Sequence, residues 1–393
     1  MTSAPHPIRR CIYVATVCAA WAVISVHPLM KYLSHTRALA ALVFGLLSIL
    51  VAMLLPDPFH LRQRRLHAGW FLLLFLLLGQ AFAVLYPISL RHTLNRGSDR
   101  EDALRIELRA VTHHEYPYAA RTFLGNPPTP LPGAMLLAAP FYAVGHIAWQ
   151  NFLWLALFFV FAARFFRYRA TALFFLATFL LFAPADLSDF TSGGDYLTNF
   201  FYVAIAATLF ARSLHRPLAV ALASAVFLGI TLSSRALYPL ILIPLLAYTL
   251  QRTPNARART LAMFAVALAA AAAITLPIFA PHPVSRLLAV VSQNSDKLRF
   301  LPAALHPRIT LPLLALATAS TAFFVRMDLP RLFLIFGAAS LVILAPSIAT
   351  FGLHSGYAFF YLSVCSLSFS LWALARYETQ PHIGPPPPSN HPH

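Results

Sequence analysis

Apolar residues fill this chain in long, nearly unbroken stretches. Stretches of roughly 17 to 22 residues, the length of a helix that crosses the hydrocarbon core of a bilayer, recur from Cys11 to Tyr377. They predict about twelve membrane-spanning helices, near residues 11–30, 37–56, 69–88, 149–165, 170–184, 198–212, 217–233, 236–251, 260–280, 309–325, 331–350 and 357–376. Because some are short or contain proline, the expected number is about 11 to 13. The predicted fold is all-α, a polytopic transmembrane helical bundle that forms one domain over residues 1–380.

Composition supports lipid as the solvent for most of the chain. Of its 393 residues 59% are hydrophobic and 10% are charged, and the mean hydropathy is +0.70. Soluble domains carry about 25% charged residues, so this chain is not one of them. No polar stretch is long enough for a separate soluble domain. Three cysteines lie in apolar stretches without metal or redox spacing, so neither chemistry is expected of them.

Arginine-rich turns set the predicted orientation. A net charge of +17 would indicate nucleic-acid binding in a soluble protein, but in a membrane protein such residues hold the cytoplasmic loops inside. With Arg9 and Arg10 before a retained signal anchor, both termini are predicted to be cytoplasmic. The residues after 380 form a disordered, proline-rich cytoplasmic tail. The cytoplasmic turns then contain Arg62, Arg64, Arg65, Arg164, Arg167, Arg169, Arg212, Arg216, Arg252, Arg257, Arg259, Arg326 and Arg331.

Acidic residues concentrate on the predicted outer face, where we expect the chemistry. Five of the twelve lie in a first outer loop, residues 89–132, and three more lie in the short loop 185–197. A further outer loop, residues 281–308, is basic. The apolar stretch 133–144 is interpreted as a helix at the outer interface. Counting it as a span would move the arginines that follow it to the outer side.

Three short motifs follow one another in the first outer loop. They read Asn-Arg-Gly-Ser-Asp-Arg-Glu-Asp-Ala-Leu from Asn95, Thr-His-His-Glu-Tyr-Pro-Tyr from Thr112, and Gly-Asn-Pro-Pro-Thr-Pro-Leu-Pro-Gly-Ala-Met-Leu-Leu from Gly125. In this order the chain resembles the first outer loop of GT-C membrane glycosyltransferases, particularly the bacterial polyprenol-phosphate-sugar-dependent, mannosyltransferase-like families. The likeness extends to about residue 244 through a Gly-Gly-Asp turn ending at Asp195 and a Ser-Ser-Arg turn ending at Arg235. Unlike that pattern, two spans separate the signal anchor from the acidic loop.

The resemblance implies transfer of a mannose-like hexose from a polyprenyl-phosphate donor to a glycan, lipid or protein acceptor outside the cell. An Asp of the first outer loop would act near the acceptor hydroxyl and take its proton. Asp99 is the first candidate for this base and Asp102 the second, while Asp99 could instead cap a helix. The two additional spans leave the choice between them open.

Cations must stabilise the departing phosphate. Arg235 is the main candidate, since an unpaired arginine near the outer boundary is costly. Its alternatives are a snorkelling anchor or a structural partner of one of the aspartates at 186–195. Arg286, Lys297 and Arg299 of the second outer loop could bind the same phosphate or anionic lipid headgroups, and Arg121 could reach the site.

Further binding residues are predicted beside this cation site. Tyr116 could stack on a sugar or belong to the aromatic belt of the membrane interface. Asp189 and Asp195 complete the predicted binding residues, and with Asp99 they could hold Mg²⁺ or Mn²⁺. We nevertheless expect no cofactor.

Other functions remain as rivals. A polytopic lipid or small-molecule transporter would carry charged residues on discontinuous spans in the middle of the membrane, whereas here the charges lie at the predicted span ends. Two further rivals are a non-catalytic scaffold within a cell-envelope complex and a polymerase of surface polysaccharide.

Overall fold

The computed structural model describes residues 7–32, 43, 45, 67–91, 98–181, 183–292, 298, 301–348 and 359–379. All regular secondary structure in these residues is helical, as the sequence predicts. Its helices are α1 (Pro7–Tyr32), α4 (Gly69–Leu90), α5 (Arg100–Thr112), α6 (Pro132–Ala143), α7 (Gln150–Phe165), α8 (Arg169–Leu181), α9 (Pro184–Thr191), α10 (Tyr196–Ser213), α11 (Leu218–Leu232), α12 (Leu242–Arg252), α13 (Arg257–Phe279), α14 (Val284–Ser292), α15 (Pro307–Ser320), α16 (Leu329–Ser347) and α18 (Ser363–Glu378). Short 3₁₀ turns are η1 (Ile147–Trp149), η2 (Tyr238–Ile241), η3 (Pro254–Ala256), η5 (Ala303–Leu305), η6 (Thr321–Phe323) and η8 (Phe359–Leu362).

Long apolar helices are consistent with the predicted membrane character of the chain. Four of them, within the described part, are long and apolar enough to cross a membrane: α4, η1 with α7, η3 with α13, and α16. A fifth is the bent pair α8 and α9. Other predicted spans do form helices, but α12 and α15 are shorter than the stretches that predicted them, with 11 and 14 residues. The predicted span 37–56 and the tail after 380 lie outside the described residues.

Lipid-facing surfaces follow from the apolar side chains that these helices leave uncovered. Leu72 and Leu76 of α4 are each 59% exposed, as is Leu276 of α13. Side chains of this kind are stable on a surface only where hydrocarbon replaces water. The outer rim of the bundle is therefore suited to lipid, while its interior is packed protein.

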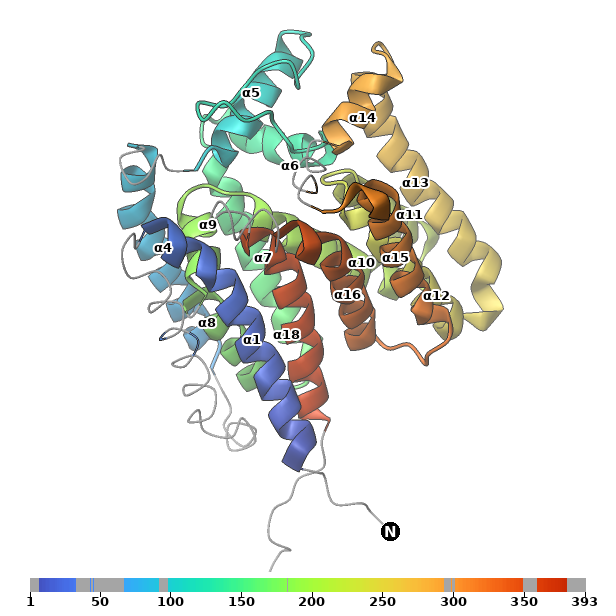
Figure 1. Cartoon of the computed structure of the whole chain (residues 1–393). Helices are drawn as coiled ribbons and strands as arrows, with labels where there is room; N and C mark the ends of the chain where they lie inside the picture. Colours follow the sequence, from blue (N-terminus) through green and yellow to red (C-terminus); the bar gives the residue numbers. More distant parts are fainter. Residues whose placement is uncertain are drawn as a thin grey trace, which may run out of the picture.

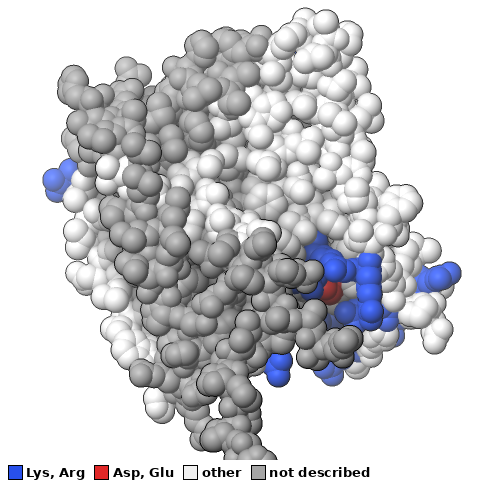
Figure 2. Space-filling view, turned by 60° about the horizontal axis from the view of Figure 1, so that its bottom comes forward, with Lys and Arg blue, Asp and Glu red and all other residues white. Residues whose placement is uncertain are grey.

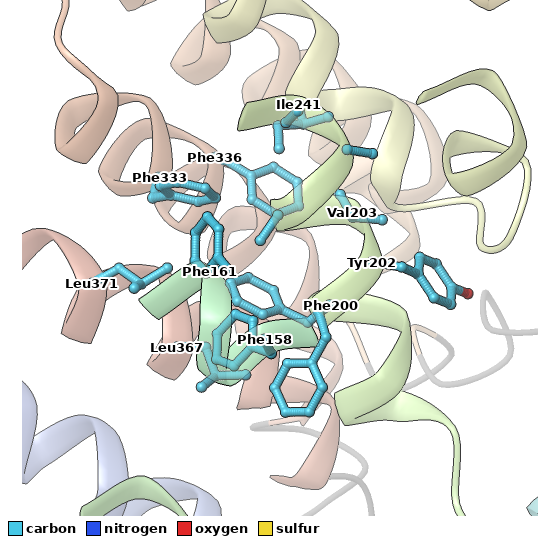
Figure 3. Close-up of a cluster of buried hydrophobic side chains, with 14 of the residues drawn as sticks. Phe158, Phe161, Phe200, Tyr202, Val203, Ile241, Phe333, Phe336, Leu367 and Leu371 are labelled. Carbon is cyan, nitrogen blue, oxygen red and sulfur yellow. The ribbon is translucent and has the colours of Figure 1, made fainter. Parts of the chain in front are cut away.

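Phenylalanine rings form the centre of the bundle. Phe158 of α7 stacks on Phe201 of α10 with their ring centroids 4.1 Å apart, and both side chains are fully buried. Phe161 meets Phe333 of α16 edge to face, at 6.4 Å (Figure 3). Ring pairs of this geometry add about 0.5–1.5 kcal/mol beyond the area that they bury. The aromatic centre thus joins α7, α10 and α16 into one rigid support.

Two ends of the bundle differ in structure. Helices α5, α6 and α14 gather at one end, which we call the α5 end (Figure 1). At the opposite end lie the start of α1 and the last residues of α18. Turns α7–α8, α10–α11, α12–α13 and α15–α16, with the last turn of α18, make up what we call the basic end.

Hydrogen bonds join the turns of the basic end. Glu378 accepts from the backbone N–H groups of Arg167 and Tyr168, and Arg376 binds Asp328 at 2.5 Å. Arg259 donates to the backbone carbonyl of Arg216. The arginine-rich turns that the sequence assigns to one side of the membrane are therefore neighbours in space, and Figure 2 brings this end forward.

Helix α9 corrects one expectation. The sequence indicates a loop over 185–197, but Pro184 begins a helix that lasts until Thr191 and lies bent by 78° from α8. Proline at the first helical position fits the helix start because its missing N–H is not needed there. The carboxylates of Asp186 and Asp189 consequently project from a helix that is packed in the bundle.

Candidate functional site

Helix α5 carries both aspartates that the sequence proposes as the base. Asp99 precedes the first turn of α5 and accepts hydrogen bonds from the Thr122 hydroxyl at 2.7 Å and the Asn126 side-chain amide at 2.8 Å. Asp102, one turn later, accepts from the backbone N–H of Phe123 at 2.9 Å. No side-chain capping bond comes from Asp99. Both aspartates therefore hold the 122–126 turn against the start of α5.

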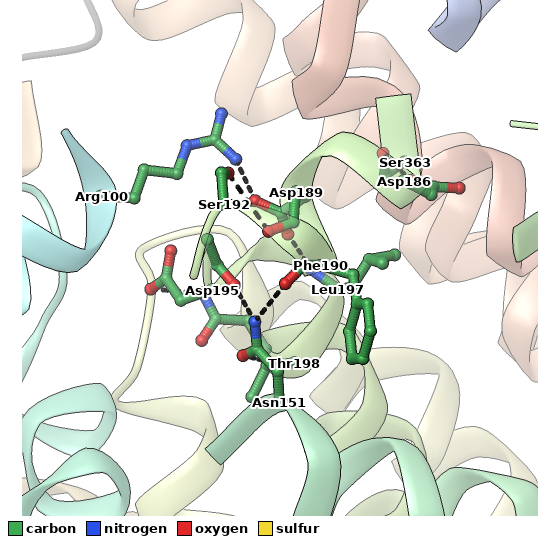
Figure 4. Close-up of polar contacts among 12 residues, drawn as sticks. Arg100, Asn151, Asp186, Asp189, Phe190, Ser192, Asp195, Leu197, Thr198 and Ser363 are labelled. Carbon is green, nitrogen blue, oxygen red and sulfur yellow. Dashed lines mark hydrogen bonds and ion pairs between the residues drawn. The ribbon is translucent and has the colours of Figure 1, made fainter. Parts of the chain in front are cut away.

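A group of buried charges lies beside this helix, and we call it the charged cluster: Arg100, Glu107, Asp189, Asp195, Tyr196 and Arg235. Two ion pairs form its frame. Arg100 binds Asp189 at 2.6 Å, and Arg235 binds Asp195. Figure 4 shows Arg100 reaching toward Asp189. The side chains of both aspartates are at most 2% exposed, and those of both arginines are 13% exposed.

Tyr196 stands between the two ion pairs. The Arg100 guanidinium lies 3.6 Å from the centroid of its ring, and the Arg235 guanidinium lies 5.0 Å away. A ring face attracts cations, and the attraction strengthens where water is excluded. Tyr361 meets the same ring edge to face at 4.9 Å. One aromatic ring therefore connects α5, the start of α10, the turn after α11 and the 3₁₀ turn before α18.

Two glycines allow the turn that brings the aspartates together. Gly193 has a φ of 72°, a conformation that L side chains rarely adopt. At Gly194 a Cβ atom would lie 1.7 Å from the Asp189 carboxylate oxygen Oδ1. The Gly-Gly-Asp turn seen in the sequence is thus required by close approach to the Arg100–Asp189 pair.

Glu107 is the unpaired member of the cluster. Its side chain is fully buried on the inner side of α5, and neither carboxyl oxygen has a hydrogen-bond partner. Burial raises the pKa of Glu107 well above its ordinary value of 4.5, the nearby Arg235 opposes this rise, and Asp195 adds to it. Oδ1 of Asp195 and Nε of Arg235 also lack partners. The cluster therefore contains unused donors and acceptors in a desolvated setting, where unmade hydrogen bonds are most costly.

Polar side chains hold the surrounding helices in register. Asn151 of α7 donates to the carbonyl of Gly194 at 2.9 Å and accepts from Thr198 at 2.7 Å (Figure 4). Thr129 accepts from Arg235 at 2.7 Å, which joins the first outer loop to the cluster. Ser363 donates to Asp186 at 2.7 Å and connects α18 to α9. The charges are thus positioned by side chains from several distant segments.

Helix α14 meets the first outer loop at a half-buried aromatic site. The Arg286 guanidinium lies 4.9 Å from the centroid of the Tyr116 ring, and the His282 ring, which is hydrogen-bonded to Arg286, meets the same ring edge to face at 4.4 Å. Tyr118 stacks on Phe279 at 5.3 Å. The structure therefore brings together two predicted binding residues, Tyr116 and Arg286, although more than 160 residues separate them in the sequence.

Other predicted site residues are less connected. Arg121 is exposed beside the 122–126 turn. Lys297 and Arg299 lie outside the described residues. Asp99 does not join Asp189 and Asp195 in a metal site, because no group of three or more His, Cys, Asp or Glu side chains suited to a metal ion occurs in the described part of the chain.

Sequence reasoning missed Arg100 and Glu107 as members of the site. A usable signal exists for Glu107: it shares one face of α5 with Leu104 and Leu108, because residues three or four apart are helix neighbours. A carboxylate on an apolar helix face is expected to be buried. Arg100 offers no such signal, since nothing local in the sequence links it to Asp189.

Comparison with known proteins gives the chain no family. No protein-family model, no curated protein and no solved structure matches it.

Proposed function

We propose that this chain is an integral-membrane glycosyltransferase, which moves a mannose-like hexose from a polyprenyl-phosphate donor to an acceptor hydroxyl on the outer side of a bacterial cytoplasmic membrane. One observation carries the proposal: the charged cluster places carboxylates and guanidinium groups together inside an otherwise apolar helical bundle. Buried charges in such a bundle are costly, and they mark functional sites more often than structural ones.

The required chemistry has a counterpart in these residues. The acceptor oxygen forms a bond to the anomeric carbon and gives its proton to a carboxylate. The bond from that carbon to the phosphate oxygen breaks, and its electron pair leaves with the phosphate. Asp99 and Asp102 remain the proposed bases.

Cations on the same end suit the departing phosphate. Arg235 lies inside the cluster, with its Nε atom unused, and Arg286 lies on the surface beside Tyr116. A guanidinium group matches the geometry of phosphate oxygens and stays charged in a desolvated site. Burial works to lower the pKa of Arg235, but Asp195 and Tyr196 outweigh it and keep the pKa raised. The contact between the exposed Arg286 and the half-buried Tyr116 would receive the lipid-linked sugar, and the cluster would act on it.

A label-transfer assay tests the proposal. Purified protein in bilayer discs would receive radiolabelled polyprenyl-phosphate mannose or glucose and an envelope acceptor fraction. Wild type would be compared with Asp99→Asn and Asp102→Asn, and the exposed Glu115→Gln is the matched control. Loss in one of the two variants, with Glu115→Gln active, would identify the base. Transfer by all variants at the wild-type rate would refute a carboxylate base on this helix.

One structural feature favours a transporter as the second candidate. The bent pair α8 and α9 resembles a discontinuous span, and its second half carries the buried Asp186 and Asp189. A transporter would bind polyprenyl-phosphate sugar without transferring the label, and it would move that lipid between the leaflets of proteoliposomes.

A further inference from the structure

The basic end presents a surface of a different kind, built almost entirely from arginine. In the described part of the chain its exposed arginines are Arg164, Arg167, Arg169, Arg212, Arg216, Arg252, Arg257 and Arg326. Figure 2 shows Lys and Arg side chains gathered on one side of this end around a small acidic patch. The whole chain has only two lysines, and neither lies in these turns.

Acidic neighbours do not neutralise this surface. Asp328 and Glu378 are the acidic residues of the basic end among those described, and both already have partners. Asp328 binds Arg376 and caps the backbone of Arg331, while Glu378 accepts from the backbone of the α7–α8 turn. The exposed guanidinium groups therefore face outward as a net positive layer.

Neighbouring turns bring several of these groups to one place. The Arg259 side chain binds the backbone carbonyl of Arg216, which ties the start of α13 to the α10–α11 turn. Arg212 lies in the last turn of α10, Arg216 lies in the turn that follows, and Arg257 begins α13. The exposed Arg216 and Arg257 therefore belong to two turns that the Arg259 contact joins.

Exposed apolar side chains also occur in the turns of the basic end. Phe324 of the α15–α16 turn, two residues before Arg326, is 88% exposed, and Leu218, two residues after Arg216, is 59% exposed. A cationic layer next to an apolar border matches a molecule that carries an anionic headgroup on an acyl chain. Planar guanidinium groups also bind phosphate through two parallel hydrogen bonds, which lysine cannot do.

We infer that the basic end is a binding surface for anionic phospholipids, whose phosphodiester groups occupy the arginines between the α10–α11 and α12–α13 turns. The inference is independent of the proposed enzymatic activity, because it concerns the opposite end of the bundle. Each basic side chain near a lipid surface strengthens such binding. Removal of two of these arginine side chains should therefore weaken the preference for anionic over neutral phospholipid about tenfold or more.

Lipid retention measures this preference. The full chain would be reconstituted in bilayer discs that contain equal amounts of phosphatidylglycerol and phosphatidylcholine. Native mass spectrometry would then identify the lipids that stay bound to the protein. Wild type is expected to retain phosphatidylglycerol preferentially, and Arg216→Gln/Arg257→Gln should lose most of that preference. Arg216→Lys/Arg257→Lys should keep an intermediate preference, because charge remains while the two-bond geometry is lost.

A matched control separates the site from overall charge. Arg91→Gln/Arg109→Gln removes the same charge from exposed positions near the α5 end and should leave the preference intact. Equal retention of both lipids by wild type would overturn the inference, and so would an equal loss in the control pair. Displacement of the lipid by millimolar inorganic phosphate would also overturn it, because a free anion would then be the ligand.

Discussion

The two ends of the bundle use arginine in opposite ways. At the α5 end, Arg100 and Arg235 are buried, each is paired with an aspartate, and both approach the ring of Tyr196. At the basic end most arginines are exposed and have few acidic neighbours. Pairing in a desolvated interior fixes geometry, whereas exposed guanidinium groups are free to meet an external anion. The same residue type therefore builds a site at one end and a surface at the other.

Loss of one arginine from a buried ion pair should show the difference between the two ends most strongly. Arg235→Gln leaves the Asp195 carboxylate buried without its cation, which should lower the free energy of unfolding by about 3–5 kcal/mol. Arg216→Gln at the basic end removes an exposed charge and should change it little. Unfolding in mixed detergent micelles measures both variants. Equal losses would show that the two arginines share the same role.

Gly194→Ala should disturb the other ion pair. The new Cβ atom would lie 1.7 Å from Asp189 Oδ1, so the Arg100–Asp189 pair must shift. Overpacking of this kind lowers stability by about 1–3 kcal/mol. Gly69→Ala is the control, because a Cβ atom there meets no atom within 4 Å. The same unfolding measurement applies, and an unchanged Gly194→Ala protein would contradict the close approach.

Thr122→Val tests how firmly Asp99 holds the first outer loop. The substitution keeps the side-chain shape but removes the hydroxyl that donates to Asp99, so the free energy of unfolding should fall by about 1 kcal/mol. Thr310→Val, which removes an exposed hydroxyl within α15, should have a smaller effect. If label transfer fell while stability stayed constant, Thr122 would serve the reaction rather than the loop.

Glu107 should have the smallest effect, which is a dependence of the free energy of unfolding on pH. Its pKa is raised in the folded state, so the folded protein holds a proton that the unfolded chain releases near pH 4.5. Stability should therefore be fully present below that pH and fall as pH rises toward the folded pKa. Glu107→Gln should flatten this slope. Unfolding midpoints at several pH values measure it, and an identical slope in both proteins would show that Glu107 is charged when folded.

Hydrophobic pattern predicted much of this structure, because lipid as a solvent leaves few choices. The predicted span near 260–280 corresponds to α13, and the predicted interfacial helix at 133–144 corresponds to α6. The bend after α8 was missed, since the apolar stretch continues to Pro184 and periodicity alone does not register the change of direction. Helix α9 was missed for the same reason.

The site was harder to predict because its contacts join distant segments. The sequence named Arg235 and offered an aspartate partner as one alternative, and the structure shows the ion pair with Asp195. It could not pair Arg100 with Asp189 across 89 positions. Such contacts depend on how distant loops pack together, and the local sequence pattern does not encode this packing.

The central claim is that the charged cluster is a reaction site. Sugar transfer by the Arg235→Lys variant tests this claim most directly. This variant keeps the positive charge beside Asp195 but loses the planar group that two oxygens can share. Radiolabel from polyprenyl-phosphate sugar would be followed for wild type, Arg235→Lys and the exposed control Arg91→Lys, each adjusted to equal folded protein. We predict a loss of about tenfold or more in Arg235→Lys and none in the control. Wild-type transfer by folded Arg235→Lys would contradict the claim.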